Sequence, residues 1–125
     1  MAEPKFYWEK ESGIQAQLLV GENAQLSCDG KQMDLLQAGS VDAAQEKHVP
    51  VVEIDGDTVK VTIGSVLHPT LPEHHIEWIY LQTNLGGHRK DVRVGEDPIA
   101  YFKLVEGESA EAVFEHCNLH GLWKK

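Results

Sequence analysis

The sequence predicts an all-β fold, an immunoglobulin-like β-sandwich with a small β appendage at its N-terminal side. From Pro50 onward, short runs of β-branched and aromatic residues alternate with turn signals at regular spacing, as in two-sheet sandwiches. Apolar residues alternate along these runs, so that Val59, Val61 and Ile63 share one face of an extended chain. This part of the chain contains no convincing amphipathic helix pattern.

Six or seven strands are expected in this region. The first two are joined by Asp55-Gly56-Asp57, a strong hairpin signal because Gly tolerates positive φ. In the third run Ile76, Trp78 and Tyr80 alternate in the same way. Gly-rich or polar turns separate the later runs. The predicted strands are residues 51–54, 58–63, 75–83, 88–94, 99–105 and 110–117.

The first 45 residues have a different pattern, with short apolar pieces at 14–20 and 33–36 between Gly, Asn, Asp and Ser. We interpret residues 1–45 as a small β appendage that ends in a linker near residues 39–45. Residues 46–125 then form the main domain.

Composition and charge argue against some classes of function. A chain of 125 residues with 42% apolar residues can bury one core. Its net charge of −9 argues against nucleic acid, since phosphate binding needs clustered Lys and Arg. No apolar run reaches the roughly 20 residues that cross a membrane, and the N-terminus lacks a secretory pattern, so we expect a soluble cytoplasmic protein. The net charge would also repel an anionic substrate unless a local cation opposed it.

Candidate metal ligands occur in four short patterns at the inferred ends of strands. A Cys-x-x-His pair can hold one metal ion from a single turn, and a His before Pro is presented by an extended or turn segment. Loops from different strands can converge at such ends. The patterns are Glu46-Lys47-His48-Val49-Pro50, His68-Pro69 followed by His74, the pair His74-His75, and Cys117-Asn118-Leu119-His120.

Simpler interpretations exist for single residues. A lone His is usually a surface or hydrogen-bonded residue, and we expect this of His88 and His116. His75 is expected to point away from a metal that His74 faces. Cys117 alone would more often be a small buried apolar residue, and a Cys28–Cys117 disulfide is only weakly indicated. The joint occurrence of the patterns favours a metal centre.

These motifs, together with Ile76-Glu77-Trp78 and the run Cys117-Asn118-Leu119-His120-Gly121-Leu122-Trp123, resemble the superoxide reductases, also called desulfoferrodoxins and neelaredoxins. The resemblance covers about residues 46–123. It implies one-electron reduction of superoxide to hydrogen peroxide, in defence against oxidative stress, at one mononuclear iron that cycles between Fe²⁺ and Fe³⁺. It further implies four equatorial ligands and one axial ligand, which are His48, His68, His74 and His120 with Cys117 axial.

The same resemblance implies catalytic roles for two charged residues. The carboxylate of Glu46 would close onto the sixth position of ferric iron, and Lys47 would attract superoxide and order a proton-carrying water. By pattern alone these residues are an ordinary solvated charge pair. An electron donor such as rubredoxin and a homodimer or homotetramer are also implied.

The N-terminal region resembles the small domain with which two-iron members begin, where four cysteines hold a second iron. The four aligned positions here are Glu9, Ser12, Cys28 and Asp29. Only one thiolate remains, so a tetrathiolate site cannot form. We expect a metal-free version of that domain, with Cys28 as an idle thiol.

Three other functions would fit parts of this pattern. A cupredoxin-like copper electron-transfer protein usually has a Met near its C-terminal Cys and His, but the only methionines here are Met1 and Met33. An immunoglobulin-like interaction module with zinc or no metal would leave the clustered histidines without a purpose. A dismutase must oxidise superoxide as readily as it reduces it, whereas an axial thiolate and an external donor favour the reductase.

Overall fold

The computed structural model describes residues 3–125 and divides the chain into two compact units, Met1–Gln37 and Ala38–Lys125. No helix within residues 3–125 is long and apolar enough to span a membrane.

The first unit consists of short antiparallel strands. One sheet has the order β2-β1-β5, and a separate two-stranded hairpin joins β3 to β4. Phe6, Tyr7, Trp8 and Met33 are buried. The strands are β1 (Lys5–Glu9), β2 (Ile14–Leu18), β3 (Ser27–Cys28), β4 (Lys31–Gln32) and β5 (Asp34–Leu35).

Glu9, at the first of the four aligned positions in this unit, is a buried carboxylate with several partners. Its Oε2 accepts hydrogen bonds from the backbone N–H of Glu11 at 2.6 Å and of Ser12 at 3.2 Å. Its Oε1 lies 3.8 Å from Nζ of Lys31. Cys28 is a free, half-buried thiol. The backbone of the β1–β2 turn is therefore organised around a carboxylate.

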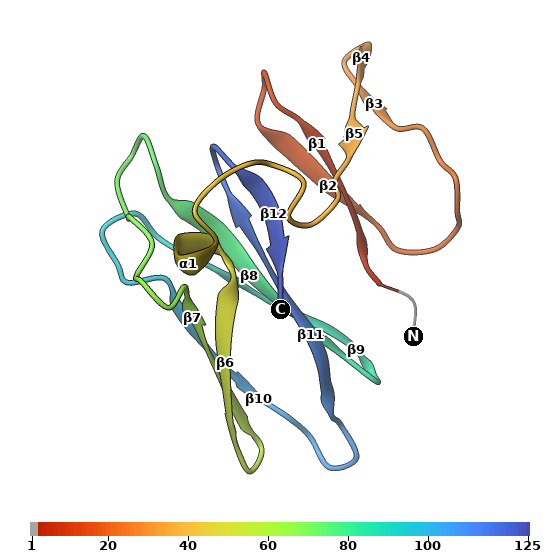
Figure 1. The fold of residues 1–125 in the computed structure, drawn as a ribbon. Helices are drawn as coiled ribbons and strands as arrows, with labels where there is room; N and C mark the ends of the chain where they lie inside the picture. Colours follow the sequence, from red (N-terminus) through yellow and green to blue (C-terminus); the bar gives the residue numbers. More distant parts are fainter. Residues whose placement is uncertain (1–2) are drawn as a thin grey trace. The chain divides into compact units, whose positions relative to one another are not determined.

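The second unit is a sandwich of two antiparallel sheets, with strand orders β10-β7-β6 and β12-β11-β8-β9 (Figure 1). One short helix, α1, precedes the first strand of the unit. The elements are α1 (Gln45–His48), β6 (Pro50–Asp55), β7 (Thr58–Ile63), β8 (Ile76–Thr83), β9 (Gly86–Asp91), β10 (Ile99–Lys103), β11 (Ala110–Cys117) and β12 (Gly121–Lys124).

The core lies between these two sheets and follows the predicted alternation. Val59, Val61 and Ile63 of β7 are fully buried, whereas the residues between them are half-buried. Side chains from β8, β10 and β11 complete the cluster, which also includes Cys117. The prediction of an all-β sandwich is confirmed.

Three local details differ from the sequence prediction. β12 was not predicted, because its four residues directly follow the Cys-x-x-His motif and its turn. Gly121 has a φ of 76°, which lets the chain reverse and pair with β11. The four-residue helix α1 is too short to give a periodic pattern, and β9 begins at Gly86 rather than at residue 88.

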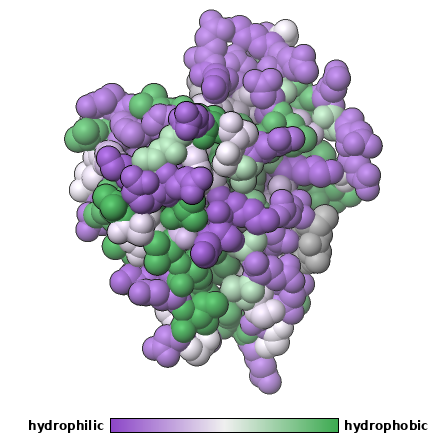
Figure 2. Space-filling model, viewed as in Figure 1, coloured by the Kyte–Doolittle hydropathy of each residue, from purple (hydrophilic) through white to green (hydrophobic). Residues whose placement is uncertain are grey.

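The pairing of β8 with β11 defines two ends of the sandwich. Ile76 lies opposite Cys117 at one end, and Thr83 lies opposite Ala110 at the other. A cavity of about 160 Å³ opens toward the Thr83 end, lined mainly by apolar side chains of β6 and β11. Figure 2 shows apolar residues gathered in the lower centre of this face, where Figure 1 places β6. All four candidate histidines and Cys117 belong to the opposite end.

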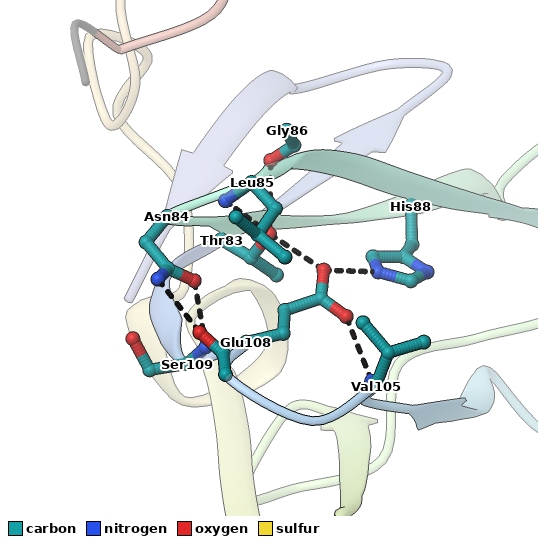
Figure 3. Close-up of polar contacts among 9 residues, drawn as sticks. Thr83, Asn84, Leu85, Gly86, His88, Val105, Glu108 and Ser109 are labelled. Atoms are coloured by element: carbon teal, nitrogen blue, oxygen red, sulfur yellow. Dashed lines mark hydrogen bonds and ion pairs between the residues drawn. The ribbon is translucent and has the colours of Figure 1, made fainter.

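A polar cluster ties the β8–β9 hairpin to the β10–β11 loop at the Thr83 end (Figure 3). The carboxylate of Glu108 accepts hydrogen bonds from Thr83 Oγ1 at 2.7 Å, His88 Nε2 at 2.8 Å and the Val105 N–H at 3.1 Å. These bonds favour the ionised form, with that from His88 contributing most, and lower the pKa of Glu108 to about 2.

This pKa predicts an acid-sensitive contribution to stability. The pKa of Glu108 is about 2 when folded and about 4.5 when unfolded, so its contribution is complete above pH 4.5 and is lost as the pH falls toward 2. Glu108→Gln should lower the melting temperature at pH 7 and have little effect near pH 2. Glu106→Gln, an exposed change in the same loop, is the control for thermal unfolding at both pH values. Equal effects of Glu108→Gln at both pH values would contradict the role of the ionised carboxylate.

Candidate metal centre

Four segments bring the predicted ligands to one end of the sandwich. His48 is the last residue of α1, and His68 and His74 lie in the connection between β7 and β8. Cys117 ends β11, and His120 lies in the turn before β12. Because every ligand follows or precedes a packed strand, the rigid sheets determine where the loops meet.

The four imidazole rings form a closed, nearly square ring. Neighbouring centroids are separated by 4.8 Å for His48 and His68, and by 4.6 Å for His68 and His74. The circuit closes at 5.1 Å from His74 to His120 and 4.9 Å from His120 to His48. The diagonal from His48 to His74 is longer, at 6.3 Å. Each ring is nearly perpendicular to its neighbours, so the rings surround a common centre.

The possible ligand atoms converge closely enough for a single ion. One ligand atom each from His48, His74, Cys117 and His120 lie within 4.8 Å of one another. Two atoms that bind the same ion at about 2.0–2.3 Å lie at most about 4.6 Å apart, so little contraction is needed. His68 is not part of this group of convergent ligand atoms, although its ring lies against those of His48 and His74.

Hydrogen bonds to the backbone determine which ring nitrogen faces the centre. Nδ1 of His48 donates to the carbonyl of Ala44 at 2.6 Å, and Nδ1 of His68 donates to that of Pro69 at 2.7 Å. Both rings then present an unprotonated Nε2 to the centre. His120 presents Nδ1, which lies 3.1 Å from His48 Nε2 and 3.9 Å from the sulfur of Cys117.

Two ring nitrogens at the centre have no hydrogen-bond partner among the described residues. They are Nε2 of His68 and Nε2 of His74, and both atoms are buried. A buried polar atom is normally hydrogen-bonded, so an unpaired one requires an explanation. A metal ion that accepts both lone pairs would provide it.

Close packing keeps α1 and His48 in place. A Cβ on Gly64 would lie 2.6 Å from the carbonyl oxygen of Glu46, so only glycine fits there. That oxygen also accepts the N–H of Val66 at 2.9 Å. The ring of Trp123 also packs against His48, with centroids 4.9 Å apart and the planes tilted by 31°. These contacts hold the backbone that carries Glu46, Lys47 and His48.

Burial favours the neutral form of His48, His68 and His74. It lowers the pKa of His48 and His74, and it lowers that of His68 to about 4, although the carbonyl of Pro69 partly opposes the shift. Neutral imidazoles are the form that binds metals. Burial also raises the pKa of Cys117 to about 11, against the smaller opposing effect of the backbone N–H groups of His120 and Leu119. Without a metal, Cys117 is therefore a thiol at neutral pH.

The two charged residues before His48 differ in exposure. Glu46 is exposed, whereas Lys47 is half-buried. The positive charge of Lys47 is one of the smaller effects that lower the pKa of His48 and of His74, after burial.

The remaining histidines of this unit take part in other contacts. Nδ1 of His75 donates to the carbonyl of Leu71 at 2.9 Å. His88 belongs to the Glu108 cluster, and His116 pairs with Glu77 at 2.7 Å and stacks on Trp78.

Comparison with known proteins decides the family. The family model described as desulfoferrodoxin matches residues 40–125. The chain belongs to the desulfoferrodoxin family.

Individual relatives agree with this family across both units of the chain. The desulfoferrodoxin of Syntrophotalea carbinolica is 46% identical over 107 residues, which are 86% of this chain and 83% of that protein. The superoxide reductase of Pyrococcus horikoshii is 37% identical, over 63% of this chain and 84% of that one. In structure, the superoxide reductase of Treponema pallidum matches with a TM-score of 0.86 and 35% identity, covering 99% of each chain.

Within this desulfoferrodoxin fold, some residues that shape the centre were given no role from sequence. Ala44 acts through its carbonyl, which no side-chain pattern reveals. Trp123 lies inside the quoted motif, but its contact with the ring of His48 depends on the unpredicted strand β12. Gly64 follows β7 and could have been noted as a glycine next to a predicted strand.

The pKa values predict that metal binding releases a proton from Cys117. At pH 8 the thiol is protonated in the metal-free chain, and a bound thiolate is not, so Co²⁺ or Zn²⁺ binding should release about one proton per chain. Cys117→Ser should reduce this release to nearly zero. Titration in weakly buffered solution with a pH indicator measures it. Equal proton release by the two proteins would show that Cys117 is not the source.

Proposed function

We propose that this desulfoferrodoxin is a superoxide reductase that reduces superoxide to hydrogen peroxide at one iron ion held by His48, His68, His74, His120 and Cys117. The observation that carries the proposal is the square of four imidazoles with a thiol beside it, in which two buried nitrogens are unpaired. The relatives named superoxide reductase support the choice of substrate.

The donor set fits iron better than the common alternatives. A structural zinc site is almost always closed by four tetrahedral ligands, whereas a square of imidazoles with one further donor leaves an octahedral position open. Imidazole and thiolate together suit ferrous iron, and a blue-copper site would need fewer imidazoles. Ferrous iron would supply the single electron that reduces superoxide.

Lys47 supplies the positive charge that the substrate needs. The chain carries a net charge of −9, so superoxide is repelled at long range unless a local cation attracts it. The charge of Lys47 contributes to the lowered pKa of His48 and His74, and in this proposal the ammonium attracts the anion and hydrogen-bonds a water that delivers protons to the product.

Glu46 is proposed as an acidic ligand of the oxidised centre. Its backbone carbonyl is held by the N–H of Val66 and the hydroxyl of Ser65, and it lies against Gly64. In this proposal its exposed side chain moves to the open position by rotation about side-chain bonds, while the backbone stays in place.

The proposed cycle also needs an electron donor, because each turnover oxidises the centre once. A small one-electron carrier of the rubredoxin kind is the proposed partner, and a homodimer or homotetramer is the proposed assembly.

Metal content and visible spectrum test the proposed function. Protein expressed with iron should contain about one iron per chain and develop a thiolate-to-ferric absorption band when stoichiometric superoxide is added. Cys117→Ser should retain the fold and lose the band. Copper or zinc in place of iron, with no response to superoxide, would contradict the proposal.

The role of Lys47 is tested by the rate of superoxide capture. Lys47→Ala should slow capture by about tenfold or more and flatten its dependence on ionic strength, because electrostatic steering is screened by salt. Lys103→Ala is the matched control, since Lys103 pairs with Asp57 at the far end of the sandwich. Pulse radiolysis at several salt concentrations measures both rates. The same rate and salt dependence in Lys47→Ala and wild type would exclude steering by this residue.

A further inference from the structure

Two asparagines extend the β8·β11 ladder, one at each end. Asn118 directly follows Cys117, the last residue of β11, and faces His75, which directly precedes β8. Asn84 directly follows Thr83, the last residue of β8, and faces Ser109, which directly precedes β11. The two positions are therefore equivalent in the antiparallel register. Only Asn118 lies at the end of the sandwich that carries the candidate metal ligands, which we call the metal end.

Both asparagines make the same three hydrogen bonds. The N–H of Asn118 donates to the carbonyl of His75 at 3.1 Å, and its Oδ1 accepts the N–H of His75 at 2.8 Å. Its Nδ2 donates to the carbonyl of Glu73 at 3.2 Å. Asn84 repeats the pattern with Ser109 at 3.2 Å and 2.8 Å, and with the carbonyl of Gly107 at 3.0 Å (Figure 3).

The side chain thus replaces a backbone acceptor. In an antiparallel pair, two facing residues exchange both hydrogen bonds through their backbones. Here the side-chain carbonyl accepts the partner's N–H instead, so the main chain can leave the sheet without losing that bond. After Asn84 the chain turns into the β8–β9 hairpin, and after Asn118 it turns toward His120.

At the metal end this arrangement surrounds one proposed ligand. His74 lies between Glu73 and His75, and Asn118 binds the backbone of both. The backbone N–H and carbonyl of His74 itself pair with Leu71. Asn118 therefore joins the backbone on both sides of His74 to the Cys117–His120 turn, next to the ladder pair of Ile76 and Cys117.

We propose that Asn118 is a positioning residue of the metal centre, which fixes His74 relative to Cys117 and His120. The inference rests on the proposed metal-binding function and adds a residue to it. His74 supplies a buried, unpaired Nε2, so a loosened segment would move one ligand out of the set. Loss of a residue that orients a ligand typically lowers metal affinity about 10–100-fold.

Asn118→Ala and Asn84→Ala form a matched pair for the test. Each removes the same two side-chain hydrogen bonds from the same ladder, so both should lower the melting temperature of the metal-free protein by a similar amount. Co²⁺ titration followed by visible absorption then separates them. Asn118→Ala should bind Co²⁺ about 10–100-fold more weakly and with an altered spectrum. Asn84→Ala should keep the affinity and spectrum of the wild type.

Two outcomes would overturn the proposal: wild-type affinity and spectrum in Asn118→Ala, or an equal loss of Co²⁺ affinity in Asn84→Ala. If Asn118→Ala does not fold, Asn118→Ser and Asn84→Ser replace the pair. Each keeps an acceptor for the facing N–H and removes the Nδ2 hydrogen bond, to the carbonyl of Glu73 or of Gly107. Asn118→Ser should then bind Co²⁺ more weakly than Asn84→Ser, and equal affinities of the two would overturn the proposal. The Co²⁺ measurement does not depend on superoxide turnover. A wild type that binds Co²⁺ but does not reduce superoxide would refute the proposed function and leave the result on Asn118 intact.

Discussion

The fold must accommodate two buried imidazole nitrogens that have no hydrogen-bond partner among the described residues. Leaving a buried polar atom unsatisfied costs about 1–3 kcal/mol, so Nε2 of His68 and of His74 together destabilise the metal-free chain by about 2–6 kcal/mol. This is a large part of the about 5–15 kcal/mol that stabilises a typical domain. A bound metal removes that cost, so metal affinity and folding free energy are coupled here. The rest of the sandwich must supply enough stability to hold the centre before the metal binds.

The sandwich meets this demand by keeping the ligands at the ends of well-packed strands. Ile63 and Ile76, which flank the connection that carries His68 and His74, are almost fully buried. Gly64 lets the backbone of α1 pass close by, and Trp123 supports the ring of His48. The imidazoles are therefore positioned by the packing of other residues rather than by the metal. Such preorganisation lowers the conformational cost of binding the ion.

The sequence is sufficient to predict the sandwich and to point to the residues that gather at one end of it, His48, His74, Cys117 and His120, but not the orientation of their rings. Alternation along β7 is strong because this strand buries one face, and the Cys-x-x-His motif is local. β8 has buried residues on both faces, and Ile79 and Leu81 join the core rather than Trp78 and Tyr80. The choice of ring nitrogen depends on the carbonyls of Ala44 and Pro69, which carry no side-chain signal. The bridge made by Asn118 depends on the register of β8 with β11, a contact between residues 43 positions apart. Tertiary register of this kind cannot be derived from a single sequence by propensity or periodicity.

An acidic chain can attract an anionic substrate when its carboxylates lie far from the site that binds the anion. At physiological ionic strength the Debye length is about 8 Å, so carboxylates farther than this from the centre act on superoxide only weakly. Glu108, for example, belongs to the opposite end of the β8·β11 ladder. The charge of Lys47 contributes to the lowered pKa of His48 and His74, whereas Glu73 acts on His74 in the opposite direction. An anion that reaches this end of the sandwich therefore meets charges of both signs at short range, rather than the net negative charge of the whole chain alone.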